Sequence, residues 1–267
     1  MSTFQAIILG IVQGLSEFLP ISSSGHLILI PELLHWNVQD RAFDVMVHMG
    51  TLLAVIIYFR KKMYDLVRSL FVKKDLSGNR RLFFLLCVSV FPAAIIGFFF
   101  GDTLSTWDRS APIVATNLIF WGIILFIADW YSKTRSAAHQ DLSRVTISNS
   151  FLIGLAQALA LIPGTSRSGI TMTAGLFQKF SKTAAAEFSF LMSIPVTALA
   201  GASTLRELLI QGTHGVSVSA MVYGGVASFI SGIVAIWLLF AVIKKISFTP
   251  FVLYRIAIGI IIFVLIV

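Results

Sequence analysis

The sequence predicts an all-α, multi-pass membrane protein. Apolar residues make up 57% of the 267 residues and only 12% are charged, whereas soluble chains carry about 25% charged residues. The mean hydropathy is +0.90. Because a helix needs about 20 consecutive apolar residues to cross a bilayer, the long apolar segments between short charged loops are expected to span it.

About six full transmembrane helices are expected, within a single membrane domain over residues 1–267. The expected spans are residues 42–60, 82–101, 112–131, 183–204, 219–243 and 248–267. In the second span, Gly97 and Gly101 have the spacing of a close-packing helix face. In the last span, Arg255 is expected to extend its charged end toward the membrane surface.

Two further apolar segments, residues 4–35 and 149–178, are each interrupted by proline and a loop of Ser and Gly. Neither half of either segment is long enough to span a bilayer, so each segment is interpreted as a re-entrant helix pair. Irregular backbone at membrane depth is tolerated only where protein or a water-filled cavity surrounds it. These pairs are therefore the expected position of a functional site.

The two interrupted segments resemble each other at an offset of 144 residues. The matching pairs are Gly10 and Gly154, Gln13 and Gln157, Leu15 and Leu159, Ser22 and Ser166, Ser24 and Ser168, and Gly25 and Gly169. This similarity predicts an internal repeat. The first copy covers about residues 4–131, the second about 149–267, and residues 132–148 link them.

The distribution of basic residues predicts the orientation. Fifteen of the 20 Lys and Arg residues fall in segments 60–81, 132–148, 179–182 and 244–245, which threading through the spans places on one side. The positive-inside rule assigns this side to the cytoplasm. Both termini then face outward, and the two interrupted pairs enter from opposite sides as an inverted-topology repeat. Such folds bind substrates near the midplane on broken helices, and we expect the site to open outward.

The net charge of +8 would suggest nucleic-acid binding in a soluble protein. Because most of the basic residues lie in the connecting loops, the positive-inside rule explains this charge instead. We therefore expect the lipid bilayer, and no nucleic acid, as a partner.

The second loop has the chemistry of an anion site. Gly164 permits a tight turn, and Thr165, Ser166 or Ser168 can cap the helix that follows. Free N–H groups at a helix N-terminus favour an anion. Arg167 offers a forked cation suited to phosphate oxygens, and Thr171 offers a hydroxyl. The structural alternative is a simple helix cap in which Arg167 pairs with Glu17.

The first loop offers a nucleophile and groups that can bind substrate. Ser22 and Ser23 provide hydroxyl groups at the start of a short helix, and Ser22, like Gln13, is expected to bind substrate. Ser23 and His26 are three residues apart and share a helix face, so His26 could serve as the base for a Ser23 nucleophile. His26 attacking phosphorus itself is a second interpretation, and a packed histidine is the structural one.

Glu17 lies one helical turn after Gln13, so both should face the same cavity. Glu17 could hold a divalent metal cation or act as a general acid or base. A simple Glu17–Arg167 ion pair is the structural alternative. Asp44 and His48 share a face of the first span, where they either line the cavity mouth or make packing hydrogen bonds.

At these two stretches the chain resembles the bacterial undecaprenyl-pyrophosphate phosphatases of the BacA type, which are linked to bacitracin resistance. The similarity covers essentially the whole chain. The matching motifs are Gln13 with Glu17, the Ser-Ser-x-Gly-His stretch 22–26, and the Pro-Gly-x-Ser-Arg-Ser-x-x-Thr stretch 163–171.

The resemblance implies hydrolysis of undecaprenyl pyrophosphate to undecaprenyl phosphate and inorganic phosphate in the bacterial inner membrane, which recycles the lipid carrier for wall synthesis. It implies a required divalent cation, Mg²⁺ or Ca²⁺, with Glu17 as metal ligand or proton carrier. It implies Ser23 or His26 as nucleophile and Arg167 as the phosphate-binding residue; Gln13 replaces one carboxylate of the acidic pair. A homodimer is left open. The alternative class is a secondary transporter or lipid flippase, because inverted repeats with broken helices are typical of transporters.

Overall fold

The computed structural model describes the chain except residues 74, 76, 108, 135–139 and 212–216. The described residues form eleven α-helices and one short 3₁₀ helix, Leu142–Arg144, and the sole β-type pairing among them is the bridge between Gln140 and Phe180. The all-α prediction is thus confirmed. Within the expected linker 132–148, residues 135–139 lie outside the described part.

In the part of the chain that the structure describes, five helices are long and apolar enough to cross a membrane. They are α3 (Arg41–Tyr58), α5 (Asn79–Ser105), α6 (Ala111–Thr134), α9 (Lys182–Gln211) and α10 (Val218–Ile243). The sixth expected span is α11 (Thr249–Leu265), an apolar helix of 17 residues. A short, polar helix, α4 (Arg60–Ser69), follows α3.

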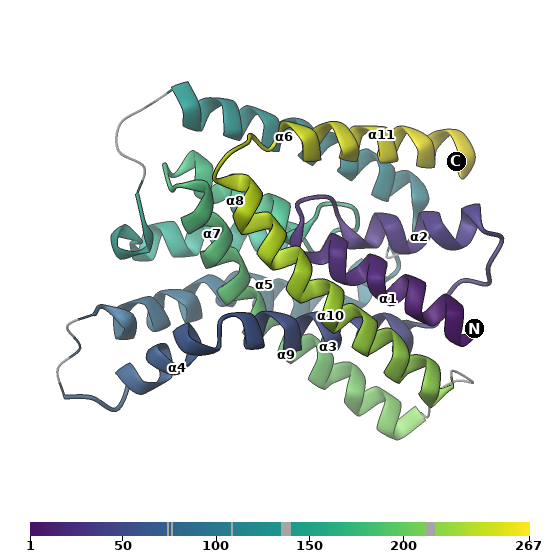
Figure 1. Ribbon diagram of the computed structural model, residues 1–267, viewed down its shortest axis with the longest axis horizontal. Coiled ribbons are helices and arrows are strands. Elements are labelled where there is room, and N and C mark those ends of the chain that lie inside the picture. The colour runs from purple at the N-terminus through teal and green to yellow at the C-terminus, as the bar shows by residue number, and fades with distance from the viewer. Residues whose placement is uncertain (74, 76, 108, 135–139, 212–216) are drawn as a thin grey trace.

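The two interrupted segments form two helix pairs, as predicted. The first pair is α1 (Thr3–Phe18) with α2 (Ser23–Leu33), and the second is α7 (Ile147–Leu159) with α8 (Arg167–Phe177). Their helices have 11 to 16 residues, too few to cross about 30 Å of hydrocarbon at 1.5 Å per residue. In Figure 1 the first pair lies toward the end that holds both termini, and the second toward the opposite end.

The helices of the two halves pack in equivalent ways. Helix α1 packs on α10 as α7 packs on α5, and α3 packs on α10 as α9 packs on α5. Helix α2 contacts α11 as α8 contacts α6. Each interrupted pair is thus embedded among helices of the other half. This pattern supports an internal repeat, and its inverted orientation across a bilayer stays a prediction.

Glycines on the interrupted helices permit this close packing. A Cβ atom on Gly10 would lie 2.3 Å from the carbonyl oxygen of Gly224 in α10, and one on Gly154 would lie 2.3 Å from that of Ser89 in α5. The predicted packing face at Gly97 and Gly101 is wrong. Among the described residues, a Cβ on Gly97 would meet its nearest neighbour at 3.9 Å, and one on Gly101 would meet nothing within 4 Å.

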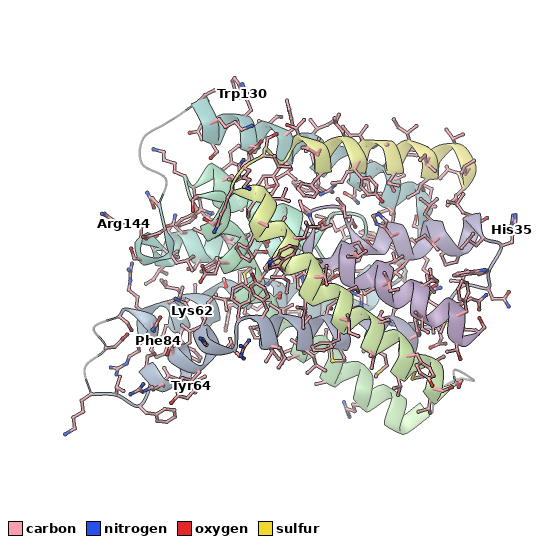
Figure 2. All side chains as sticks on the ribbon, viewed as in Figure 1. His35, Lys62, Tyr64, Phe84, Trp130 and Arg144 are labelled. Carbon is pink, nitrogen blue, oxygen red and sulfur yellow. The ribbon has the colours of Figure 1, made fainter. Side chains whose placement is uncertain are left out.

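The two ends of the molecule differ in charge. Lys62 and Arg144 lie at one end, and His35 lies at the other, beside the two termini (Figures 1 and 2). Between the ends, large apolar side chains face outward, such as Phe98, which is 84% exposed. Because exposed apolar surface on this scale is unfavourable in water, this belt is suited to lipid.

Candidate active site

The two loops start their helices with the same unusual backbone. Ser22 has φ 71° and ψ 104°, and Ser166 has φ 69° and ψ 105°. Residues other than glycine rarely adopt positive φ. In the second loop, the Ser166 side chain caps α8 by accepting from the Gly169 N–H at 3.2 Å. Of the three candidate capping residues, Ser166 is therefore the one that caps the helix. Each of these serines is the residue just before a short helix, α2 in the first loop and α8 in the second.

Hydrogen bonds join the two loops to each other. The Gly164 N–H donates to Ser24 Oγ at 3.1 Å, and Ser168 Oγ donates to the Leu19 carbonyl at 3.1 Å. The loops, which are about 140 residues apart in sequence, therefore form one unit.

Arg255 of α11 lies behind this unit and is completely buried. Its guanidinium donates to five carbonyl oxygens, at 3.0 to 3.5 Å: those of Pro20, Asn117, Leu118, Gly164 and Thr165. The prediction that Arg255 extends to the membrane surface is wrong, because these inward carbonyls bind it instead. Arg255 thus connects the first loop, the second loop and α6.

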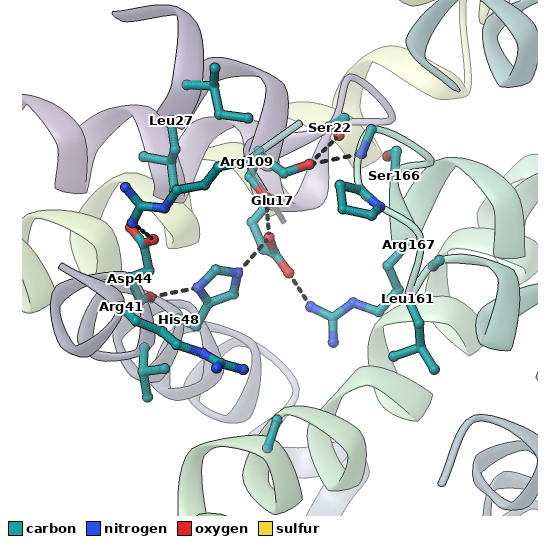
Figure 3. Close-up of a pocket in the computed structure, with 18 of the residues that line it drawn as sticks. Glu17, Ser22, Leu27, Arg41, Asp44, His48, Arg109, Leu161, Ser166 and Arg167 are labelled. Atoms are coloured by element: carbon teal, nitrogen blue, oxygen red, sulfur yellow. Dashed lines mark hydrogen bonds and ion pairs between the residues drawn. The ribbon is translucent and has the colours of Figure 1, made fainter. Parts of the chain in front are cut away.

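Glu17, near the end of α1, is the centre of the polar cluster (Figure 3). Its Oε1 accepts from Arg167, and its Oε2 accepts from Ser23 Oγ at 2.7 Å and from Gln13 Nε2 at 3.0 Å. His48 Nε2 lies 3.7 Å from the same Oε2. The Glu17–Arg167 contact expected under the structural alternative is therefore present. In addition, Ser23 lies beside the Glu17 carboxylate, which can accept its proton.

Arg167 also reaches across to α9, where its Nη1 donates to Thr197 Oγ1 at 2.5 Å. Two partners on different helices fix the plane of the guanidinium. Its side chain is 20% exposed, so part of it remains open to the cavity.

His26 is not bonded to Ser23. Its Nδ1 lies 2.7 Å from the Ser22 carbonyl oxygen, and its Nε2 lies 2.8 Å from the Tyr254 hydroxyl, with the two rings stacked. The carbonyl can only accept, so Nδ1 carries a proton, and a neutral ring then accepts the Tyr254 O–H at Nε2. The predicted Ser23–His26 pair is therefore not formed in this structure, where Glu17 takes the place beside Ser23.

A cavity of about 830 Å³ opens onto this cluster. Six of the predicted site residues line it: Glu17, Ser22, Ser23, Gly164, Ser166 and Arg167. Four others are outside its lining: Gln13, His26, Ser168 and Thr171. Thr171 Oγ1 is bonded to the Arg167 carbonyl and to Ser189. The substrate-binding roles of Gln13, Ser168 and Thr171 stay predictions.

The cavity extends toward the end of the molecule that holds the termini. Its rim includes Val38 and Gln39, just after His35, and Ile266 at the C-terminus. Arg41 and Arg109 also line it. Glu32 and Asp44 line it as well, and Arg109 is paired with Asp44, so this part of the lining carries charges of both signs.

Asp44 and His48 line the cavity, as one of the two interpretations expected. Asp44 Oδ2 accepts from Arg109 at 3.1 Å, and His48 Nδ1 lies 2.6 Å from the Asp44 carbonyl oxygen. These contacts set His48 between the rim and Glu17 (Figure 3).

The donors around Glu17 suit a hard cation that the substrate helps to bind. Mg²⁺ and Ca²⁺ prefer oxygen ligands, and Mg²⁺ often takes only one or two carboxylates together with phosphate oxygens. Glu17 supplies a carboxylate, and the buried Oε1 of the adjacent Gln13 has no hydrogen-bond partner among the described residues. Nowhere in the described ranges do three His, Cys, Asp or Glu side chains form a metal-binding group.

Sequence reasoning missed Tyr254. It assigned no role to Ser24 or to Gln157, both of which line the cavity. Tyr254 carried no signal, because it lies 228 residues after its partner His26 and outside both stretches. Gln157 did carry one, because it matches Gln13 at the offset of the repeat.

The fold and the site together define a multi-pass, all-α membrane protein with a polar cavity built on two interrupted helix pairs. The family described as bacitracin resistance protein BacA matches residues 6–261. An undecaprenyl-diphosphatase of Campylobacter curvus is 42% identical over 265 residues, and one of Alteromonas mediterranea is 44% identical over 263 residues; each alignment covers 97% of both chains. The chain belongs to the BacA family.

Proposed function

We propose that this protein is an undecaprenyl-diphosphatase that hydrolyses undecaprenyl pyrophosphate to undecaprenyl phosphate and inorganic phosphate. The observation that carries the proposal is the meeting of Ser23, Glu17 and Arg167 in one cavity. The names of the relatives support hydrolysis rather than transport.

In the first step, Ser23 Oγ attacks the terminal phosphorus. Its proton moves to Glu17 Oε2, which already accepts its hydrogen bond at 2.7 Å. The new Oγ–P bond forms as the bridging P–O bond breaks, and Glu17 passes the proton to the departing polyprenyl phosphate. General base catalysis of this kind contributes about 100-fold to 10,000-fold in rate.

In the second step, water attacks the phosphoserine. Glu17 accepts a proton from this water and returns a proton to Ser23 Oγ as the O–P bond breaks and inorganic phosphate leaves. Ser23 and Glu17 end in their starting protonation states, so the cycle is complete.

Arg167 and the N-termini of α2 and α8 stabilise the phosphoryl group. Arg167 is a fixed, forked donor, and the helix N-termini add oriented N–H groups where negative charge develops. A bound Mg²⁺ or Ca²⁺, held by Glu17, would neutralise further phosphate charge.

The lipid tail of the substrate remains in the bilayer, while its headgroup enters the cavity. We propose that the cavity opens on the outer side of the inner membrane. Two observations support this orientation. The cavity rim and both termini share one end of the molecule, and the basic residues Lys62 and Arg144 lie at the other. The positive-inside rule assigns the basic end to the cytoplasm.

The proposal is tested by measuring phosphate release from undecaprenyl pyrophosphate by the purified protein, with and without EDTA. We expect release by the wild type, its loss with EDTA, and its loss in Ser23→Ala and Arg167→Ala. No release from folded wild-type protein would refute the proposed activity. Full release in EDTA would refute only the cation requirement.

A further inference from the structure

Gln157 of α7 is buried, with a relative exposure of 2%, and lines the cavity. In the part of the chain that the structure describes, neither its Oε1 nor its Nε2 has a hydrogen-bond partner. Among the side chains that line the cavity, Gln39 and Asp44 also have one such atom, but their other polar atoms are bonded. Buried polar groups in proteins are almost always paired, so a wholly unpaired amide at a cavity wall indicates a ligand.

The repeat explains why this amide is left unpaired. In the first copy, Gln13 donates to Glu17, four residues later. In the second copy, Gln157 occupies the position of Gln13, but Leu161 occupies the position of Glu17. The second copy therefore keeps the amide donor and lacks its carboxylate acceptor.

The surroundings indicate the chemistry of the missing acceptor. Gln157, Gly164, Ser166 and Arg167 line one cavity, and the last two stand at the N-terminus of α8. The cavity thus combines an amide, a cation and a helix N-terminus, all of which donate hydrogen bonds or favour negative charge. An anion with several acceptor oxygens fits all three.

We propose that Gln157 is a further phosphate-binding residue, whose Nε2 donates to a non-bridging oxygen of the substrate diphosphate and of the inorganic phosphate product. A phosphate oxygen would thus accept the hydrogen bond of the Gln157 amide, as Glu17 accepts that of Gln13 in the first copy. This inference rests on the proposed phosphatase function and adds a residue that neither motif contains.

The test is Gln157→Met, which keeps the length of the side chain and removes the amide. Removing a hydrogen bond to a charged group should raise KM for undecaprenyl pyrophosphate by about 10-fold to 100-fold, with a smaller change in kcat, because the contact exists in the ground state. The concentration of inorganic phosphate that gives a set protection of the detergent-purified protein against thermal unfolding should rise by a similar factor.

A structural role for Gln157 predicts a different result. If the amide stabilised the fold, Gln157→Met would lower the unfolding temperature of the ligand-free protein. If its role is to bind a ligand, replacing this buried, unpaired amide with an apolar group should leave the unfolding temperature of the ligand-free protein unchanged or raise it. The unfolding temperature therefore separates the two roles.

The matched control is Ser150→Ala, on the same helix. Ser150 Oγ is also buried without a partner among the described residues, but it lies outside the cavity lining. This variant should keep the wild-type KM and phosphate protection. Unchanged KM and protection in Gln157→Met, beside an active wild type, would overturn the inference alone; an inactive wild type would refute the phosphatase function itself.

Discussion

Glu17 combines three contacts that no other described residue of the site combines: the nucleophile Ser23, the cation of Arg167 and the amide of Gln13. Glu17→Gln keeps the size of the side chain but removes the oxygen that accepts the Ser23 proton. We expect a rate of phosphate release about 100-fold to 10,000-fold lower. Activity above a tenth of wild type in a variant that purifies as a monodisperse protein would exclude Glu17 as the base.

The nucleophile can be identified from the covalent intermediate. Because Ser23 contacts Glu17 while His26 contacts Tyr254 and Ser22, we expect a phosphoserine. Quenching with labelled substrate should trap protein-bound phosphate that is stable in acid and released in base, and Ser23→Ala should trap none. Acid-labile, base-stable label that disappears in His26→Ala would establish the histidine as nucleophile instead.

At the scale of the element, α11 fixes the two loops through the adjacent residues Tyr254 and Arg255. Arg255→Met would leave several buried carbonyl oxygens without donors, at about 1–3 kcal/mol for each. We expect a lower unfolding temperature and loss of activity, measured in detergent. Arg255→Lys should recover part of the stability, because one ammonium group can serve some of these carbonyls.

Lys245→Met, at an exposed position, is the control for loss of a positive charge in the same half. It should leave the unfolding temperature unchanged. An Arg255→Met protein as stable as wild type would show that the carbonyls do not depend on this side chain.

The packing of the interrupted helices depends on glycine. Gly10→Ala would place a methyl group 2.3 Å from the Gly224 carbonyl oxygen, so α1 and α10 must separate. Overpacking of this kind costs about 1–3 kcal/mol, and the unfolding temperature should fall. Gly101→Ala, where a Cβ meets no atom of the described residues within 4 Å, should be neutral or slightly stabilising. Equal effects of the two changes would contradict the packing described for α1.

At the scale of the whole molecule, the orientation can be measured by labelling single cysteines in a Cys87→Ser background. Asn37 lies in the exposed segment between α2 and α3, and Asn79 begins α5 near the basic end. A membrane-impermeant maleimide added to intact cells should label a cysteine at residue 37 and not one at residue 79. The reverse pattern would place the cavity on the cytoplasmic side.

Local patterns in the sequence were sufficient to predict the long apolar helices and both interrupted pairs, but not α4, which lies in a segment expected to be a connecting loop. Long apolar runs and their breaks at Pro20 and Pro163 are visible within about 30 residues, and the match between the two stretches placed Glu17, Ser23 and Arg167 in one site. Contacts that depend on partners far along the chain were not predictable. Arg255 binds carbonyls 90 to 235 residues away, and the packing of Gly10 depends on α10 rather than on a local glycine spacing.

The positive φ angles of Ser22 and Ser166 have a consequence for what these loops are optimised for. Glycine adopts such angles freely, whereas a residue with a side chain is strained there by about 1–3 kcal/mol. A chain selected for folding stability alone would carry glycine at both positions. Both copies carry serine instead. Each loop therefore has a hydroxyl group at the N-terminus of a helix, at the cost of a part of the protein's folding stability.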